Sequence, residues 1–237
     1  MHYQLIRSKR KSIALQVLAG KVIVRAPLLT SINYIERLLT KKLSWIEDKI
    51  NRQDCDKQNL NQFVDGGKIW FNGKQHPLTV TKAVKNSIIF NENGFLITLK
   101  NARHKPSKTD QSSASDITAS RIKKMIEVWL KQQAQRYLIP QTKKLSIQMS
   151  LTPMAINIRQ YKARWGSCNS LGNIQFNYLL MMAPQWVVDY VIVHELSHLA
   201  HLNHGSEFWQ LVEKHYPEYQ SAKHWLKSHQ QQLQWVL

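Results

Sequence analysis

One segment constrains this chain more than any other. Residues 185–202 form an apolar run that follows Pro184 and contains His194, Glu195 and His198. The length of the run and the proline before it predict a helix, because the first turn of a helix tolerates proline. Histidines four positions apart project from one face of a helix, so both imidazoles can reach one metal ion, and the glutamate between them can address a water molecule on that ion. We therefore expect a buried helix that carries a metal site.

A third protein ligand for the metal has two candidates, His201 and His204. On an uninterrupted helix His201 shares the face of the first two histidines, whereas His204 points about 80° away. His204 can bind only if the helix ends, and Asn203 and Gly205 are residues that end helices. We favour His204, since ligands on consecutive turns become too distant for one tetrahedral ion and a returning loop does not. The alternatives are His201 as the ligand and a solvated histidine face without a metal.

Charge and histidine occupy different parts of the chain. The sequence has 33 Lys and Arg against 15 Asp and Glu, a formal net charge of +18. Residues 1–150 contain 27 basic and 10 acidic residues, whereas residues 151–237 contain 6 and 5. Seven of the ten histidines lie in the last 44 residues. The upstream part would therefore suit a polyanion such as nucleic acid, and the downstream part would carry the chemistry.

The pattern of apolar residues predicts an α+β fold with two domains. Residues 1–105 form a basic, β-rich N-terminal domain with a helix. In it, strands at 8–17 and 21–26 form a hairpin, a helix capped by Thr30 or Ser31 follows, and short strands punctuated by Asn-Gly turns come next.

The second domain is predicted to follow a linker. Residues 106–116 are rich in serine and poor in apolar side chains, which is typical of a surface linker. Residues 117–237 then open with a helix that ends before Pro140, because the residue before a proline disfavours helical geometry. A strand at 155–160 and a hairpin whose second strand is 173–180 come before the histidine helix.

Cysteine content and hydropathy indicate in which cellular compartment the protein is expected. Cys55 and Cys168 are the two cysteines, so a disulfide framework does not organise the fold, and a reducing, cytoplasmic location is the default. The longest apolar run falls far short of the roughly 18 residues of a membrane span. The basic N-terminus is followed by no apolar stretch, so we predict no secretory signal and no membrane partner.

Several short motifs stand out together. They are Arg164–Cys168, Gly172–Asn177, Tyr190–Leu199, Asn203-His204 and Phe208-Trp209, with Ser8–Ser12, Arg25–Pro27 and Trp45-Ile46 upstream. These motifs closely resemble the YgjP-like metallopeptidases, a family related to the SprT and WLM (Wss-like) zincins. The resemblance implies a small gluzincin-like (minigluzincin) fold in the C-terminal domain. It also implies a Zn²⁺ ion held by His194, His198 and His204, with Glu195 as the catalytic base.

This ligand set predicts a hydrolytic mechanism. A zinc ion with three protein ligands keeps a fourth position for water and lowers the pKa of that water toward about 7. Glu195 would take the proton as the water attacks a carbonyl, and would pass it to the leaving amine. If strand 173–180 lies at a sheet edge, it could bind an extended peptide, with Gln175 and Asn177 sharing one face. An ordinary solvated strand face is the alternative for these two residues.

Three functions compete. The leading prediction is a zinc metallopeptidase that acts on a protein or peptide. The second keeps the metal but hydrolyses a nucleoside triphosphate such as UTP, an activity also ascribed to YgjP-like proteins, with Arg159, Lys162 and Arg164 available for phosphate. A histidine-rich site suits zinc better than the Mg²⁺ usual in phosphate chemistry, which favours the peptidase. The third is a nucleic-acid-binding protein with conditional protease activity, since SprT-type proteases cleave proteins crosslinked to DNA and residues 1–150 are basic.

Overall fold

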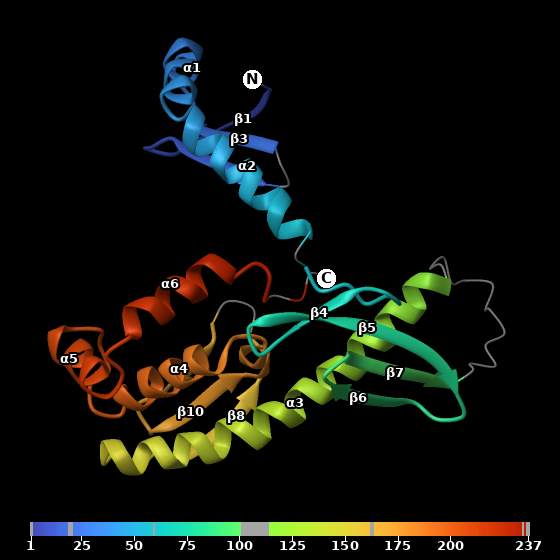
Figure 1. Ribbon diagram of the computed structural model, residues 1–237. Helices are drawn as coiled ribbons and strands as arrows, with labels where there is room; N and C mark the ends of the chain where they lie inside the picture. Colours follow the sequence, from blue (N-terminus) through green and yellow to red (C-terminus); the bar gives the residue numbers. More distant parts are fainter. Residues whose placement is uncertain are drawn as a thin grey trace. The chain divides into compact units, whose positions relative to one another are not determined.

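The chain forms two compact units that mix helices and sheets, which confirms the α+β class (Figure 1). The computed structural model describes residues 2–18, 21–58, 60–100, 114–161, 164–233 and 235. The first unit is Met1–Asn59 and the second is Leu60–Leu237. Among the described residues, no helix combines the length and the hydrophobicity that crossing a membrane requires.

The first unit is a three-stranded sheet with two helices. Its elements are β1 (Tyr3–Ser8), β2 (Ala14–Leu18), β3 (Lys21–Pro27), α1 (Ile32–Lys41) and α2 (Leu43–Gln58). The predicted β2–β3 hairpin is present, and β1 adds a strand parallel to β3, which lies in the centre. The Ser31 side chain caps α1 by accepting a hydrogen bond from the Tyr34 N–H, as predicted. Val24, Ile35 and Ile46 are fully buried, so this unit has a core of its own.

The second unit begins with a four-stranded sheet. Its strands are β4 (Lys68–Phe71), β5 (Lys74–Ala83), β6 (Ser87–Asn91) and β7 (Gly94–Lys100), in the order β4-β5-β7-β6. Strands β5 and β7 are parallel, and the two outer pairs are antiparallel. Asn72 and Gly73 have positive φ angles of 48° and 77°, the conformation that a two-residue hairpin turn between β4 and β5 needs.

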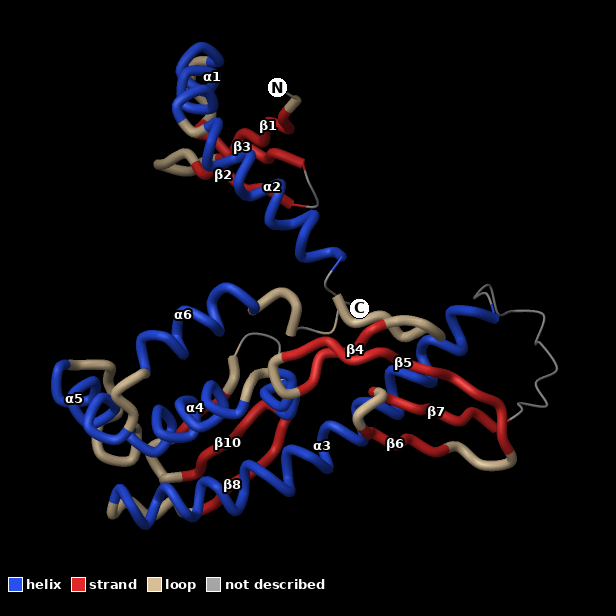
Figure 2. The backbone as a smooth tube through the Cα atoms, viewed as in Figure 1, coloured by secondary structure: helices blue, strands red, loops and turns tan. Residues whose placement is uncertain are grey.

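A long helix, α3 (Ala114–Met149), joins this sheet to the C-terminal part of the unit (Figure 2). The prediction that the helix ends before Pro140 is wrong, because α3 continues through the proline for nine more residues. Pro140 and Arg136 are both exposed, so water can reach the Arg136 carbonyl that loses its hydrogen-bond donor. Burial of the residues on the opposite face, such as Thr142 and Met149, offsets the cost of the proline.

The C-terminal part holds a small sheet against three helices. Its elements are β8 (Ala155–Arg159), β9 (Gly166–Cys168), β10 (Asn173–Asn177), the 3₁₀ helix η1 (Tyr178–Met182), α4 (Gln185–Ser197), α5 (Ser206–His215) and α6 (Tyr219–His229). The sheet order is β8-β10-β9, so β10 is the central strand and the short β9 is an edge. The predicted strand 173–180 is therefore neither an edge strand nor extended beyond Asn177. It ends there because the Asn177 side chain caps η1 by accepting from the Leu179 N–H.

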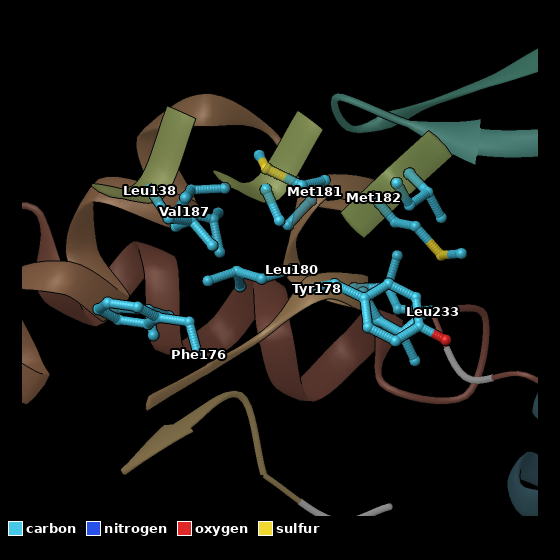
Figure 3. Packing of buried hydrophobic residues seen from close by; sticks show 14 of the residues in the cluster. Leu138, Phe176, Tyr178, Leu180, Met181, Met182, Val187 and Leu233 are labelled. Atoms are coloured by element: carbon cyan, nitrogen blue, oxygen red, sulfur yellow. The ribbon is translucent and has the colours of Figure 1, made fainter. Parts of the chain in front are cut away.

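One hydrophobic core runs through the whole second unit. Figure 3 shows Leu138 of α3, Phe176 of β10 and Val187 of α4 meeting around the buried residues of η1. The same core includes Ile97 of β7 and Trp129 of α3. Because the four-stranded sheet packs on α3, it belongs with the C-terminal part of the chain.

The domain boundary therefore differs from the predicted one. The sequence predicted a domain 1–105, a linker 106–116 and a domain 117–237, whereas the structure divides the chain after Asn59. Residues 106–113 of the expected linker lie outside the described residues, and Ala114–Asp116 already belong to α3. Composition alone does not distinguish a polar stretch that connects two elements of one core, here β7 and α3, from a linker between two cores.

Candidate metal centre

Helix α4 positions the first two candidate ligands. Its apolar residues are buried around nearly the whole circumference, from Val187 to Leu196, so the helix lies inside the core rather than on the surface. His194 occupies the last turn of α4, and His198 is the C-cap residue that follows it. The two rings lie 5.0 Å apart between centroids, on one face of the helix, as their spacing predicts.

Helix α4 ends at Ser197, before His204, and His204 can approach the first two histidines only if the helix ends. After His198 the chain turns and starts α5 at Ser206, with Gly205 as the N-cap residue. His204 thereby returns to the first two histidines, and its Nε2 lies 3.1 Å from the Nε2 of His194. Ligand nitrogens of His194, His198 and His204 all lie within 4.8 Å of one another. Two nitrogens on one tetrahedral zinc stand about 3.3 Å apart, so this spacing suits a shared ion.

His201, the alternative ligand, points elsewhere. Its Nδ1 lies 3.6 Å from a carboxylate oxygen of Glu207 on α5. His201 contacts the candidate ligands through its backbone instead, since its carbonyl oxygen lies 3.1 Å from Nδ1 of His198. An Nδ1–H that donates to this carbonyl leaves Nε2 of His198 free as a ligand atom.

Glu195 is buried in α4, directly after His194. Its side chain is 5% exposed, and its Oε2 has no hydrogen-bond partner among the described residues. Burial raises the pKa of this carboxyl to about 8, and the positive charge of Arg164 acts in the opposite direction. A buried carboxyl oxygen without a partner is costly, so this atom lacks a polar partner among the described residues.

The electrostatic setting keeps the imidazoles neutral. Burial lowers the pKa of His194 to about 3, and the charges of His198, His204 and Lys223 add to the effect. Burial also lowers the pKa of His198, although its hydrogen bond to the His201 carbonyl works against this shift. Neutral imidazole is the form that coordinates a metal, so the lowered pKa of both residues favours the form that can bind one.

The three predicted substrate residues have different surroundings. Arg164 is exposed, and its guanidinium lies 5.2 Å from the ring centroid of Tyr161. Gln175 is half-buried and accepts a hydrogen bond from the Tyr161 hydroxyl. Asn177 is 2% exposed, and its amide donates to the carbonyls of Tyr161 and Arg164. The polar groups of Asn177 are thus engaged with the backbone, which gives this side chain a structural task.

Sequence reasoning missed four aromatic and basic neighbours of the histidines. The Tyr190 hydroxyl lies 3.4 Å from Nδ1 of His194, one helical turn away, and helical spacing could have found it. Phe208 packs between His198 and His204, with ring centroids 4.6 and 4.8 Å away. Trp209 stacks on His204, and Lys223 lies over the indole. No spacing rule connects the last two to the histidines, because they come from α5 and α6.

One family model matches most of this chain. A family model described as "YgjP-like, metallopeptidase domain" matches residues 11–229. Among solved structures, the metallopeptidase zymogen abylysin of Pyrococcus abyssi aligns with 21% identity over 38% of this chain and 93% of that chain, at a TM-score of 0.35. No curated protein matched this chain.

Proposed function

Because this chain belongs to the YgjP-like metallopeptidase family, we propose that it hydrolyses peptide bonds with a zinc ion held by His194, His198 and His204. The donor set supports this metal, since three neutral imidazoles suit zinc better than Mg²⁺ or Ca²⁺, which prefer oxygen ligands. The partnerless Oε2 of Glu195 beside these ligands supports a water molecule bound there. When bound, the ion acts as a Lewis acid that lowers the pKa of a coordinated water toward about 7.

Glu195 is the proposed general base. It follows His194 directly on α4, and the local helix keeps it in the core next to the ligands. A carboxyl whose pKa burial raises holds a proton more readily than an exposed one, which suits a group that must accept a proton and release it again. We propose that Glu195 takes the proton of the attacking water and passes it to the leaving amine.

Strand β9 is the proposed platform for the peptide substrate. It is an edge of its sheet, whereas β10, the strand the sequence favoured, has partners on both sides. The Asn177 N–H donates to the Trp165 carbonyl and the Asn169 N–H to the Asn173 carbonyl. By the antiparallel alternation, the backbone groups of Gly166 and Cys168 point to the free side of β9. An extended peptide can pair with these groups and bring a carbonyl to the centre.

Arg164 is the proposed contact for the polarised carbonyl or for a nearby anionic group of the substrate. It immediately precedes the edge-strand region, is exposed, and its charge acts on Glu195. Gln175 remains a candidate substrate contact, together with the Tyr161 hydroxyl, which donates a hydrogen bond to it. Arg164 would equally suit a phosphate, so the UTP prediction is kept as the competing outcome of the assay.

The experiment compares zinc-loaded protein with Glu195→Gln and with chelator-treated protein, on an unfolded protein substrate and on UTP. We expect proteolysis that the chelator abolishes and zinc restores, and a loss of about 10³-fold or more in Glu195→Gln although zinc stays bound. Unchanged proteolysis in Glu195→Gln would exclude this residue as the base. Hydrolysis of UTP alone, dependent on Glu195, would replace the peptidase with the nucleotide hydrolase.

Nucleic-acid recruitment through residues 1–150 is a further part of the proposal. Lys9, Lys11, Lys21 and Arg25 of the first unit are all exposed, which supports contact with a phosphate backbone. We expect the full chain to bind duplex DNA at low salt, with an affinity that falls as salt rises. An affinity independent of salt, or no binding at low salt, would remove DNA from the proposed function.

A further inference from the structure

An open groove of about 1090 Å³ lies between the start of α4 and the length of α6. Among the residues that line it are Trp186, Tyr190, Lys223, Trp225 and Lys227. Tyr190 stands between the groove and the metal centre, because it lines the groove and its hydroxyl lies 3.4 Å from Nδ1 of His194. The groove and the centre are therefore neighbours that share this residue.

Lys223 is held by aromatic rings, one of which also contacts the histidines. Its ammonium lies 4.0 Å from the ring centroid of Trp209 and 5.9 Å from that of Tyr219. Trp209 in turn lies 5.8 Å from His204 and 5.9 Å from His194, between ring centroids. Trp209 thus lies between the ammonium of Lys223 and the candidate ligand His204. Contacts with aromatic faces leave the N–H groups of the ammonium available to another partner.

The charge of the groove is uncompensated. Both Lys223 and Lys227 line it, and no Asp or Glu is among the described residues that do. No described carboxylate lies within ion-pair distance of Lys223. An anion is the group that this arrangement lacks.

We propose that this groove is a substrate subsite of the peptidase, and that Lys223 binds the carboxylate of a Glu or Asp residue adjacent to the cleaved bond. The inference rests on the proposed peptidase function and names its substrate preference. A single ammonium against the rings of Trp209 and Tyr219 matches the short apolar stem and the single charge of such a side chain. Lys223 and Lys227 stand one helical turn apart on the same face of α6, so a nucleoside triphosphate is the competing occupant that the test has to separate from the peptide.

The test uses two peptides that differ only in Glu or Gln next to the cleaved bond. We expect the zinc-loaded wild type to cleave the Glu peptide with a kcat/KM about tenfold higher than the Gln peptide. Lys223→Met should bring this ratio close to one, and Lys223→Glu should invert it. Lys214→Met, which removes a lysine of α5 outside the groove, is the matched control and should keep the wild-type ratio.

Binding is measured separately from cleavage. In the Glu195→Gln background, the fluorescence anisotropy of the labelled Glu peptide should report a Kd that rises about tenfold when Lys223 is also changed to Met. If the wild type cleaves both peptides equally and Lys223→Met changes neither ratio nor Kd, the subsite is refuted. If no peptide is cleaved but binding of the Glu peptide depends on Lys223, the subsite stands and the peptidase function fails. If Lys223 affects the binding of UTP and not of the peptide, the occupant is a nucleotide and the proposal is overturned.

Discussion

Gly166 and Glu195 are packed so closely that no side chain fits between them. A Cβ atom added to Gly166 would lie 2.5 Å from Oε1 of Glu195 and 2.7 Å from its Cγ. The glycine belongs to the edge strand β9 and the glutamate to α4, so this contact sets the distance between the proposed peptide platform and the proposed base. A glycine is required at this place by the approach of the glutamate rather than by its own backbone conformation.

Gly166→Ala should therefore impair catalysis without removing the metal. The added methyl group must push the carboxylate or the strand away, and a displacement of about 1 Å in a catalytic group costs on the order of 10²-fold in rate. The measurement is kcat/KM together with the zinc content of the purified protein. Gly205→Ala is the matched control, because nothing lies within 4 Å of a Cβ at that glycine. Full activity in Gly166→Ala would show that Glu195 does not need its present position.

His204→Ala should weaken zinc binding far more than His201→Ala. His204 belongs to the cluster of three ligand nitrogens, whereas the His201 ring faces Glu207 and contributes through its backbone carbonyl. We expect a loss of more than 10²-fold in zinc affinity for His204→Ala and less than about tenfold for His201→Ala. Competition with a chromogenic chelator measures both. The opposite order would identify His201 as the third ligand.

Glu195→Gln should make the metal-free protein more stable at high pH. Burial raises the pKa of this carboxyl in the folded protein from its ordinary value near 4.5 to about 8. The folded state therefore holds a proton that the unfolded state has released, and wild-type stability falls as the pH rises from about 4.5 to about 8. Glutamine does not titrate, so the difference between the variants should grow across this window, up to about 5 kcal/mol, and level off above it.

Urea denaturation with a chelator at pH 5, 7 and 9 measures this difference. The lowered pKa of His194 acts in both proteins, so it cancels in the comparison. A difference that stays constant from pH 5 to pH 9 would mean that Glu195 ionises in the folded protein as it does in the unfolded chain.

Asn177→Ala should unfold the chain more easily, whereas Gln175→Ala should not. The Asn177 side chain is buried and satisfies the carbonyls of Tyr161 and Arg164 and the N–H of Leu179. Removing it leaves buried backbone groups without partners, at a cost of about 2 to 4 kcal/mol. Thermal denaturation compares the two variants. Equal stability of Asn177→Ala and wild type, with a raised KM, would return Asn177 to the role of substrate contact.

The elements whose pattern is local were predicted well. The hairpin of β2 and β3, the Ser31 cap and the helix through His194 and His198 follow from periodicity and turn chemistry within a few neighbouring residues. The wrong predictions concern features that packing between elements decides. Pro140 lies inside a helix because packing on the opposite face outweighs a local cost, and β10 is central because β8, which precedes β9 in the chain, pairs with its other side.

The sequence by itself determined which residues make up the candidate site: two histidines one turn apart, a glutamate between them, and a third histidine placed just after a break in the helix. The spacing decides this, because helix geometry is the same in every protein. Only the tertiary structure decided what surrounds these residues. It brought Gly166 against Glu195, Trp209 against His204, and Lys223 to the edge of the centre. These contacts join β9, α5 and α6 to α4, and packing between elements leaves no periodic signal in the sequence.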